Sequence, residues 1–412
     1  MVNNIAHNKY PASVQHGKPR LSPLKEGWRT VKIGDLVTEI NRPVEMKDEE
    51  IYTLVTAKRS RGGIVKRENL KGKDIAVKSQ FYIREGDFLI SKRQIVHGAC
   101  GFVPKELDGA IVSNEYLVLN CTDIILPGFL DLLKETVYFQ QICFHSSIGV
   151  HVEKMLFKVA QWYRWKINIP TIKEQEKIAS FLGAIATRLT QLHRKQELLQ
   201  TYKRGVMQKI FSQEIRFKQD DGSDFPDWQK KKLGELGSLL GGGTPRTSQS
   251  NHWIGNIPWI SSSDIEEDSI YKVSITRFIN EAAIKESATK IIPPKSILIV
   301  SRVGVGKIAV SEQELCTSQD FSNFTPNKGN IYFLAYWFLA YKKKLLSIAQ
   351  GTSIKGFTIY DLSLLKIDFP HLKEQEKIAN FLTAIDQKIE AVGQQIERME
   401  QFKKGLLQKM FV

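Results

Sequence analysis

Two stretches of this chain repeat one another at an offset of 200 residues. Residues 170–211 and 370–411 align without a gap and are identical at 18 of 42 positions. Both contain Lys-Glu-Gln-Glu-Lys-Ile-Ala shortly after a proline. A shorter match lies upstream at the same offset, where Trp28, Gly34 and Leu36 recur as Trp228, Gly234 and Leu236. A repeat of this kind indicates a chain built from two similar halves.

The two repeated stretches have the pattern of long amphipathic helices. Pro170 and Pro370 stand where a helix can begin, and carboxylates follow in the first turn. Apolar side chains then recur at alternating spacings of four and three, which is typical of a coiled coil. About 40 residues would make a rod of roughly 60 Å. The predicted seam residues are Ile178, Leu182, Ile185, Leu189, Leu192, Leu199, Ile378, Leu382, Ile385, Ile389, Val392 and Ile396.

Each helix is the simplest partner for the other, and polar seam residues at Gln196, Lys203 and Lys403 would fix their register. Antiparallel pairing would place two variable domains at opposite ends of the rod, whereas parallel pairing would place them side by side. The segment 212–227 is polar and turn-rich, so it is predicted to be a linker long enough to let the second domain swing away.

The variable domains have a mixed α/β pattern. Short β-branched runs occur at 51–55, 88–90, 110–112, 117–119, 297–300 and 307–310, and apolar helical stretches occur at 127–143 and 331–348. The predicted division is a loose, flexible basic N-terminal arm at 1–25, a first domain at 26–168, a first helix at 169–212, a second domain at 213–368 and a second helix at 369–412.

The charge favours a polyanionic partner. The net charge is +15 and the sequence pI is about 9.4, and a duplicated basic chain suits a ligand with two separated, similar sites, such as double-stranded DNA. Four cysteines, none paired at metal-ligand spacing, favour a reducing compartment. No apolar run reaches the roughly 18 residues of a membrane span, and the N-terminus lacks a signal-peptide pattern. We therefore predict a cytoplasmic protein with no membrane partner.

A catalytic set is not evident. The stretch Gly304–Lys307 resembles a phosphate-binding loop, but Ser301 replaces the first glycine and Ile308 replaces the magnesium-binding hydroxyl residue. The chain has no Asn/Asp-Pro-Pro-aromatic sequence of an amino-methyltransferase, and its histidines are scattered. We predict no catalytic, cofactor-binding or metal-binding residue.

Basic and polar residues in predicted loops are better candidates for DNA contact. Arg and Lys suit guanine edges, although each such residue can equally be a solvated charge or a phosphate contact that carries no sequence information. The candidates are Lys58, Arg59, Arg61, Lys92, Arg93, Arg246, Ser261, Ser263, Arg302, Lys307 and Lys355.

The repeated helices resemble the conserved regions of the specificity subunit of type I restriction–modification enzymes. Both follow a proline, open with Lys-Glu-Gln-Glu-Lys-Ile-Ala and close with Lys-x-Gly-x-x-Gln-Lys-x-Phe. The stretch 225–228 (Phe-Pro-Asp-Trp) resembles the opening of a target recognition domain, as does Gly-Thr-Pro at 243–245 followed by 253–261. The first domain departs from the pattern, because it lacks the Gly-Thr-Pro…Trp stretch.

The resemblance implies two mixed α/β target recognition domains, separated by two long helices packed as an antiparallel coiled coil. Each domain would read one half of a bipartite, asymmetric DNA site with a fixed gap. The chain itself would not be catalytic. It would hold two methyltransferase subunits, which use S-adenosylmethionine to methylate adenine, and two restriction subunits, which need ATP and magnesium.

Three alternatives stay open at this point. The chain could be the specificity partner of a bipartite type II restriction system, a coiled-coil DNA-binding regulator without enzymatic partners, or a self-sufficient DNA enzyme, against which the missing catalytic motifs argue. If the chain is a type I specificity subunit, its two helices act as a ruler that fixes the gap between the half-sites. Four added residues lengthen a helix by about 6 Å, which corresponds to one or two base pairs.

Overall fold

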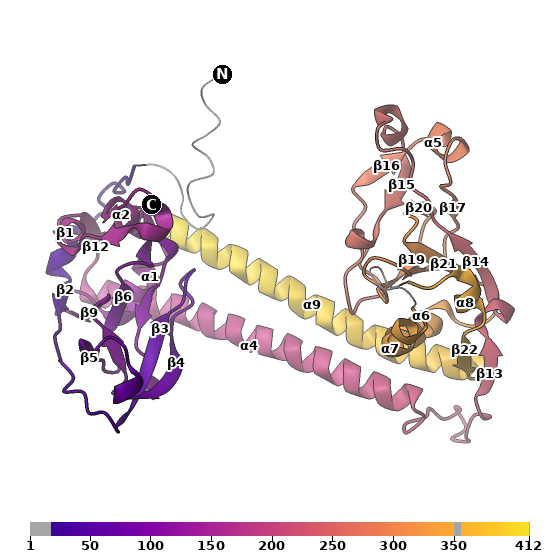
Figure 1. The fold of residues 1–412 in the computed structure, drawn as a ribbon, viewed down its shortest axis with the longest axis horizontal. Coiled ribbons are helices and arrows are strands. Elements are labelled where there is room, and N and C mark those ends of the chain that lie inside the picture. The colour runs from indigo at the N-terminus through magenta and orange to yellow at the C-terminus, as the bar shows by residue number, and fades with distance from the viewer. Residues whose placement is uncertain (1–17, 350–355, 412) are drawn as a thin grey trace. The chain divides into compact units, whose positions relative to one another are not determined.

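The computed structural model describes residues 18–349 and 356–411, and the chain forms two compact units (Figure 1). Unit 1 comprises Met1–Gln191 and Ile396–Val412, and unit 2 comprises Leu192–Gln395. Each unit therefore contains one α/β domain and one half of each long helix. This division differs from the predicted one, in which each helix was a separate segment.

Unit 1 contains two four-stranded sheets within its described residues. One has the order β2-β9-β6-β7 and the other β4-β3-β8-β5. Strand β3 pairs antiparallel with β4 and parallel with β8. The strands are β1 (Arg29–Lys32), β2 (Val37–Glu39), β3 (Ile51–Ala57), β4 (Ile64–Lys71), β5 (Gln80–Tyr82), β6 (Phe88–Ser91), β7 (Cys100–Phe102), β8 (Ile111–Ser113), β9 (Tyr116–Cys121), β10 (Ser147–Ile148), β11 (Leu156–Phe157) and β12 (Lys166–Ile169).

Unit 2 repeats the topology of these two four-stranded sheets. Its sheets have the orders β14-β21-β18-β19 and β16-β15-β20-β17, and β15 pairs antiparallel with β16 and parallel with β20. The strands are β13 (Gln229–Lys232), β14 (Gly237–Gly241), β15 (Ile257–Ile260), β16 (Arg277–Ile279), β17 (Ile291–Ile292), β18 (Ser296–Val300), β19 (Ile308–Ser311), β20 (Leu315–Thr317), β21 (Phe321–Pro326) and β22 (Lys366–Phe369). The duplication thus covers the whole domain and not only the helix.

A strand pair closes each domain onto its long helix. β1 pairs antiparallel with β12, and β13 pairs antiparallel with β22. The shorter helices are α1 (Pro127–Leu133), α2 (Val137–His145), α3 (Val159–Trp162), α5 (Glu281–Lys285), α6 (Ile331–Ala340), α7 (Lys342–Ile348) and α8 (Ile359–Ser363). The apolar helical stretch predicted at 331–348 forms α6 and α7, and residues Phe333–Leu339 of α6 are all buried. No helix among the described residues is both long and apolar enough to cross a membrane.

The long helices are α4 (Ile172–Phe211) and α9 (Leu372–Phe411), and they pack antiparallel within each unit. In unit 1 the beginning of α4, from Ile178 to Leu189, packs with the end of α9, from Met399 to Phe411. In unit 2 the end of α4 packs with the beginning of α9 around Ile378. The predicted antiparallel pairing is confirmed, and all twelve predicted seam residues are buried or half-buried.

The start of each long helix is anchored to its domain by two side chains of the repeated sequence. Trp28 Nε1 donates to Glu174 at 3.1 Å, and Trp228 Nε1 donates to Glu374 at 3.0 Å. Gln175 donates to Pro170 O at 3.1 Å and accepts from Leu126 N at 2.9 Å. Its counterpart Gln375 makes the same two kinds of bond, to Pro370 O at 2.7 Å and from Asn330 N at 2.8 Å. The Glu-Gln repeat is therefore a domain anchor as well as a helix start.

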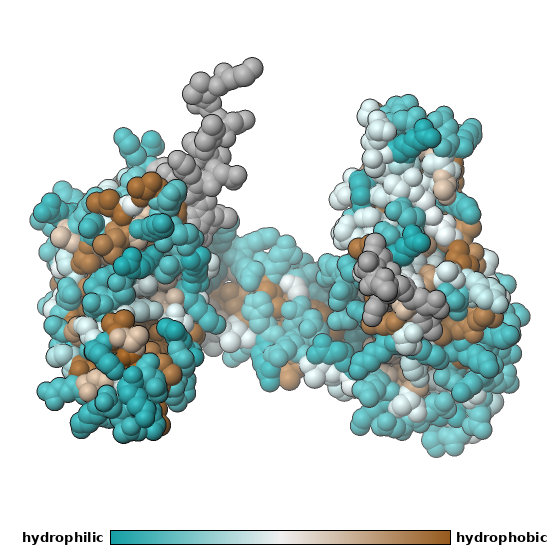
Figure 2. All heavy atoms as spheres, viewed as in Figure 1, coloured by the Kyte–Doolittle hydropathy of each residue, from teal (hydrophilic) through white to brown (hydrophobic). Residues whose placement is uncertain are grey.

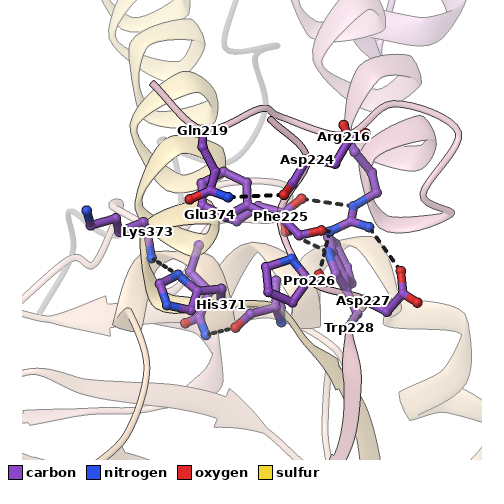
Figure 3. A network of polar contacts seen from close by, with 12 residues as sticks. Arg216, Gln219, Asp224, Phe225, Pro226, Asp227, Trp228, His371, Lys373 and Glu374 are labelled. Carbon is purple, nitrogen blue, oxygen red and sulfur yellow. Dashed lines mark hydrogen bonds and ion pairs between the residues drawn. The ribbon is translucent and has the colours of Figure 1, made fainter. Parts of the chain in front are cut away.

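The segment 212–227 is packed on α9, which corrects its prediction as a swinging linker. Arg216 forms an ion pair with the fully buried Glu374 at 2.9 Å and donates to Pro226 O at 2.7 Å (Figure 3). Phe217 packs on Phe381. The cause is the buried carboxylate of Glu374, which needs a cationic partner, and the hydrogen bond to Glu374 raises the pKa of Arg216.

The predicted N-terminal arm lies partly outside the described residues, which begin at residue 18. Its described end is not a loose arm. Lys25 Nζ donates to Lys409 O and Met410 O, both at 2.8 Å, at the C-terminal end of α9. A lysine at this position satisfies carbonyl groups that have no partner within the helix. Asn168 Nδ2 also donates to Ser22 O at 2.9 Å.

Candidate functional site

Most of the predicted DNA-contacting residues lie in two loops of each domain, and a third loop packs against them. The first loop joins β3 to β4, or β15 to β16. The second joins β6 to β7, or β18 to β19, and the third follows the helical layer near the end of the domain. These loops comprise 58–63, 92–99 and 146–158 in unit 1, and 261–276, 301–307 and 356–358 in unit 2. The candidates of the two halves thus come from equivalent loops.

Backbone hydrogen bonds bring the three loops of unit 1 together. Ser60 N donates to His97 O at 2.7 Å, which joins the first loop to the second. Phe157 N donates to Lys92 O at 3.0 Å, which joins the third loop to the second. Ser60 has a φ of 55°, in the left-handed region that few side chains adopt. The loop cluster is therefore a built arrangement at one edge of the domain.

The loops of unit 2 meet in the same way. Phe357 N donates to Ser301 O at 3.1 Å, as Phe157 does to Lys92 O in unit 1. Both phenylalanines are buried, at 5% and 4% exposure. Lys307 joins the first loop to the second by donating to Ser262 O at 3.2 Å and Ile265 O at 3.1 Å.

Two arginines occupy equivalent positions in the second loops. Arg93 is the second residue after β6, and Arg302 is the second residue after β18. Both are exposed. Each is followed by a tight turn, with Gly98 at a φ of 77° and Gly304 at 87°. We regard these arginines as the strongest pair of candidates, because the fold places them at the same position in both domains.

Acidic partners hold the basic side chains of unit 1 in place. Arg59 pairs with Glu153 at 2.7 Å, and Arg93 pairs with Glu115 at 2.6 Å. The side chains are between 45% and 60% exposed, and exposed ion pairs contribute only about 0–1 kcal/mol. A phosphate or a guanine edge can therefore replace these carboxylates at little cost. Arg61 is more enclosed and lies 3.4 Å from Glu135.

A buried histidine lies beneath this cluster. His97 is 4% exposed, and its Nε2 lies 3.3 Å from Glu153. Burial lowers the pKa of His97, and the charge of Arg59 lowers it further. The ring is therefore neutral at pH 7 and contributes shape rather than charge to the loops.

Several predicted residues have internal roles. Lys307 binds two backbone carbonyls, and Lys92 donates to Asn114 O at 2.8 Å. Ser261 accepts from Arg277 at 2.7 Å and bonds Ser263 at 2.8 Å within the first loop of unit 2. These contacts give Lys307 and Ser261 roles within the fold, and their contact with DNA stays a prediction. Lys58 and Arg246 are exposed, and Lys355 lies outside the described residues.

The Gly-Thr-Pro…Trp stretch is a packing motif in unit 2. Gly243 O accepts from Trp259 Nε1 at 3.0 Å and from Thr289 Oγ1 at 3.0 Å. A Cβ at Gly242 would lie 2.1 Å from Ser318 O, so only glycine fits there. Arg277 lies over the Trp259 ring at 4.6 Å and was missed as a candidate, because nothing in its local sequence marks it as part of this loop.

The third loop of unit 1 was also missed. It forms the hairpin β10–β11, where exposed Lys154 and Lys158 add to the basic cluster. The sequence signal was the long segment between Ser147 and Pro170, which is an insertion relative to the second half. Figure 2 shows a largely hydrophilic face of the molecule, with hydrophobic residues in small groups.

Arg302→Ala is expected to relax discrimination at the half-site read by the second domain by about 1–3 kcal/mol. Arg93→Ala should do the same only at the other half-site. Binding to duplexes with single-base changes in each half-site measures both effects. Lys328→Ala is the matched control. Lys328 is exposed and follows the end of β21, whereas Arg302 lies near the beginning of that strand. Equal relaxation of both half-sites by either arginine variant would contradict the assignment.

Comparison with known proteins identifies the family to which both halves of the chain belong. Residues 25–200 and 226–401 each match the family model of the type I restriction modification DNA specificity domain. The type I restriction enzyme MjaIX specificity subunit of Methanocaldococcus jannaschii is 34% identical over 212 residues, which cover 49% of this chain and 48% of that protein. The putative MjaX specificity subunit of the same organism is 28% identical over 418 residues, covering 95% and 94%.

A similar fold is known from a solved structure. It comes from work on the structural basis underlying complex assembly and conformational transition of the type I R-M system. The TM-score is 0.59 at 21% identity, and the match covers 95% of this chain and 99% of the other. At this identity the likeness concerns the fold. It agrees with the repeated sheet topology of the two units.

Proposed function

Since the chain belongs to the family of type I restriction–modification DNA specificity domains, we propose that it is the DNA-reading subunit of such a system. Each domain reads one half of a bipartite, asymmetric site through its three loops, and the long helices set the gap between the halves. The observation that carries this proposal is the shared order of the four-stranded sheets in the two units, which presents equivalent basic loops twice. The net charge of +15 supports a polyanionic ligand.

The partners and cofactors belong to the same proposal. The chain holds two methyltransferase subunits and two restriction subunits, which its family membership and its likeness to a chain of a type I R-M assembly support. S-adenosylmethionine, ATP and magnesium act in those subunits and not in this chain. The complex works in the cytoplasm, which contains the DNA and keeps cysteines reduced. All four cysteines are free thiols.

Co-expression with the neighbouring methyltransferase subunit, followed by mapping of methylated adenines across the host genome, tests this function. A bipartite sequence with a constant gap is the expected result. Methylation by the purified chain alone, with cofactor added, would show a self-sufficient enzyme instead. A chain that binds DNA but never co-purifies with a methyltransferase would be a regulator. A fused methyltransferase–nuclease partner would identify the type II arrangement.

The modular assignment has its own test. Replacing residues 1–165 by the first domain of another family member should change one half of the methylated site and leave the other half and the gap unchanged. The two domains fold around separate cores, so each reader should keep its own preference. A change in both halves would contradict the assignment of one half-site to each domain.

A further inference from the structure

An apolar tip projects from the basic loop cluster of unit 1. It belongs to the β10–β11 hairpin, where Val150 is 90% exposed and Ile148 is 59% exposed. Val150 is the most exposed large hydrophobic side chain among the described residues. A single exposed apolar residue is common, but this one stands at the end of a hairpin with a second apolar residue beside it.

The base of the hairpin is firmly attached to the domain. Ser147 pairs with Phe157, and Ser147 Oγ donates to Cys143 O at 2.9 Å. Lys158 N donates to Ser146 O at 2.7 Å. A Cβ at Gly149 would lie 2.8 Å from Met155 Cα, so the two sides of the hairpin are in close contact just below the tip. The domain therefore presents Val150 at a defined position.

The surroundings of the tip are basic. Lys154 and Lys158 are exposed on the same loop, and Arg59 reaches the hairpin through its ion pair with Glu153 at 2.7 Å. Phe157 N binds Lys92 O, which places the base of the hairpin beside Arg93. A cationic rim around an apolar tip is complementary to a phosphate-lined groove with stacked bases inside it. Proteins that deform duplex DNA combine the same two features.

We propose that Val150 is an apolar wedge that enters the duplex at the half-site read by the first domain. The basic rim binds the flanking phosphates, and the valine presses against a base step and partly unstacks it. Part of the specificity of this half-site then comes from how easily its sequence deforms. The inference rests on the proposed function, since it requires that these loops face DNA.

The test uses the chain co-expressed with its methyltransferase subunits and duplexes that carry the mapped site. 2-Aminopurine replaces successive adenines in each half-site, because its emission rises when it unstacks. Apart from the target adenines, which the methyltransferase subunits flip out, the wild-type complex should raise the emission at one step, in the half-site read by the first domain only. Val150→Ser should abolish that rise and weaken binding about tenfold. The salt dependence should stay unchanged, because no phosphate contact is lost.

Two further variants separate the wedge from a general effect. Val150→Leu keeps an apolar tip and should retain the emission change. Val77→Ser is the matched control, since Val77 is 49% exposed and lies outside the three loops. It should behave like the wild type. Lys154→Ala, in contrast, should reduce the slope of log affinity against log salt by about 0.9.

Three results would overturn the wedge. One is the absence of any emission change outside the flipped target adenines with the wild-type complex, and another is unchanged affinity of Val150→Ser. The third is a Val150→Ser chain that no longer assembles with the methyltransferase subunits in gel filtration but still binds DNA normally. That result would show that the tip contacts a protein and not DNA. Failure of the proposed function itself is distinct, because the wild-type complex would then not prefer the mapped site over a scrambled duplex.

Discussion

Insertion of four residues into each long helix is expected to lengthen the gap between the two half-sites by about two base pairs. The insertion points are between Gln191 and Leu192 in α4 and between Gln395 and Ile396 in α9, where the two compact units divide. Four helical residues add about 6 Å, and a base pair rises about 3.4 Å. Methylation of the original site should fall to background, since its half-sites no longer match the spacing.

The insertion leaves both units intact. The contacts of α4 and α9 with the two domain cores lie on one side or the other of these points. A four-residue insertion in a heptad pattern is a stutter, which coiled coils absorb by local unwinding. Making it in both helices keeps their apolar stripes facing each other beyond the insertion.

The measurement is adenine-methylation mapping in cells that express the variant with its methyltransferase. A matched control places the same four residues at Asp221–Gly222, an exposed turn in the segment between α4 and β13. This control should leave the gap unchanged. If the helix variant methylates half-sites at the original spacing, the helices do not act as a ruler.

The sequence predicted the helices well because their pattern is periodic and occurs twice. The predicted bounds of 169–212 and 369–412 lie within three residues of Ile172–Phe211 and Leu372–Phe411. The short β-branched runs also fell on strands, such as β6 and β18. Their order in the sheets was not predictable, because the partners of these strands are distant in sequence and the two domains share few residues.

The loop candidates were only partly readable from the sequence. Arg93 and Arg302 were both among the candidates, but their equivalence appears only when the topology of β6–β7 is set beside that of β18–β19. Lys307 was predicted as a basic loop residue, and the structure adds that it binds carbonyls of a neighbouring loop. Sequence alone does not say which polar atoms are already used within the fold.

The packing of segment 212–227 was missed for the same reason. Its composition is that of a flexible linker, but composition does not determine whether the segment packs on the fold. Its position is fixed by Arg216, whose partner Glu374 lies in the repeated helix. Glu374 was assigned to the helix start, but its full burial requires a hydrogen-bonded and cationic environment. The linker supplies that environment.

Lys203→Met is expected to lower the free energy of unfolding by about 3–5 kcal/mol. Lys203 lies in the helix seam, and its Nζ is 2.7 Å from Asp386 of α9. The two side chains are only 6% and 14% exposed. Without the lysine, Asp386 still accepts from the Tyr336 hydroxyl at 2.6 Å. Burial and the charge of Asp386 raise the pKa of Tyr336, so this hydroxyl stays protonated and cannot neutralise the carboxylate.

The repeat provides a matched control for this variant. Lys403 stands at the position of Lys203 in the second helix, and Ala186 stands at the position of Asp386 in the first. Lys403 is half-buried, and Lys403→Met should change the free energy of unfolding by less than about 1 kcal/mol. Denaturant unfolding followed by circular dichroism measures both variants.

The double variant Lys203→Met, Asp386→Leu tests whether the ion pair stabilises the fold or instead fixes how the two helices pair. Removing both charges leaves no unpaired buried charge, and the Tyr336 hydroxyl keeps Tyr271 as a partner at 3.2 Å, so most of the lost stability should return. The helices should then pair with less selectivity, because a copy of α4 could replace α9 without leaving a buried lysine opposite Ala186. The expected result is a stable chain that forms mixed oligomers in gel filtration. A double variant that is as unstable as Lys203→Met would instead show that the pair itself contributes the stability.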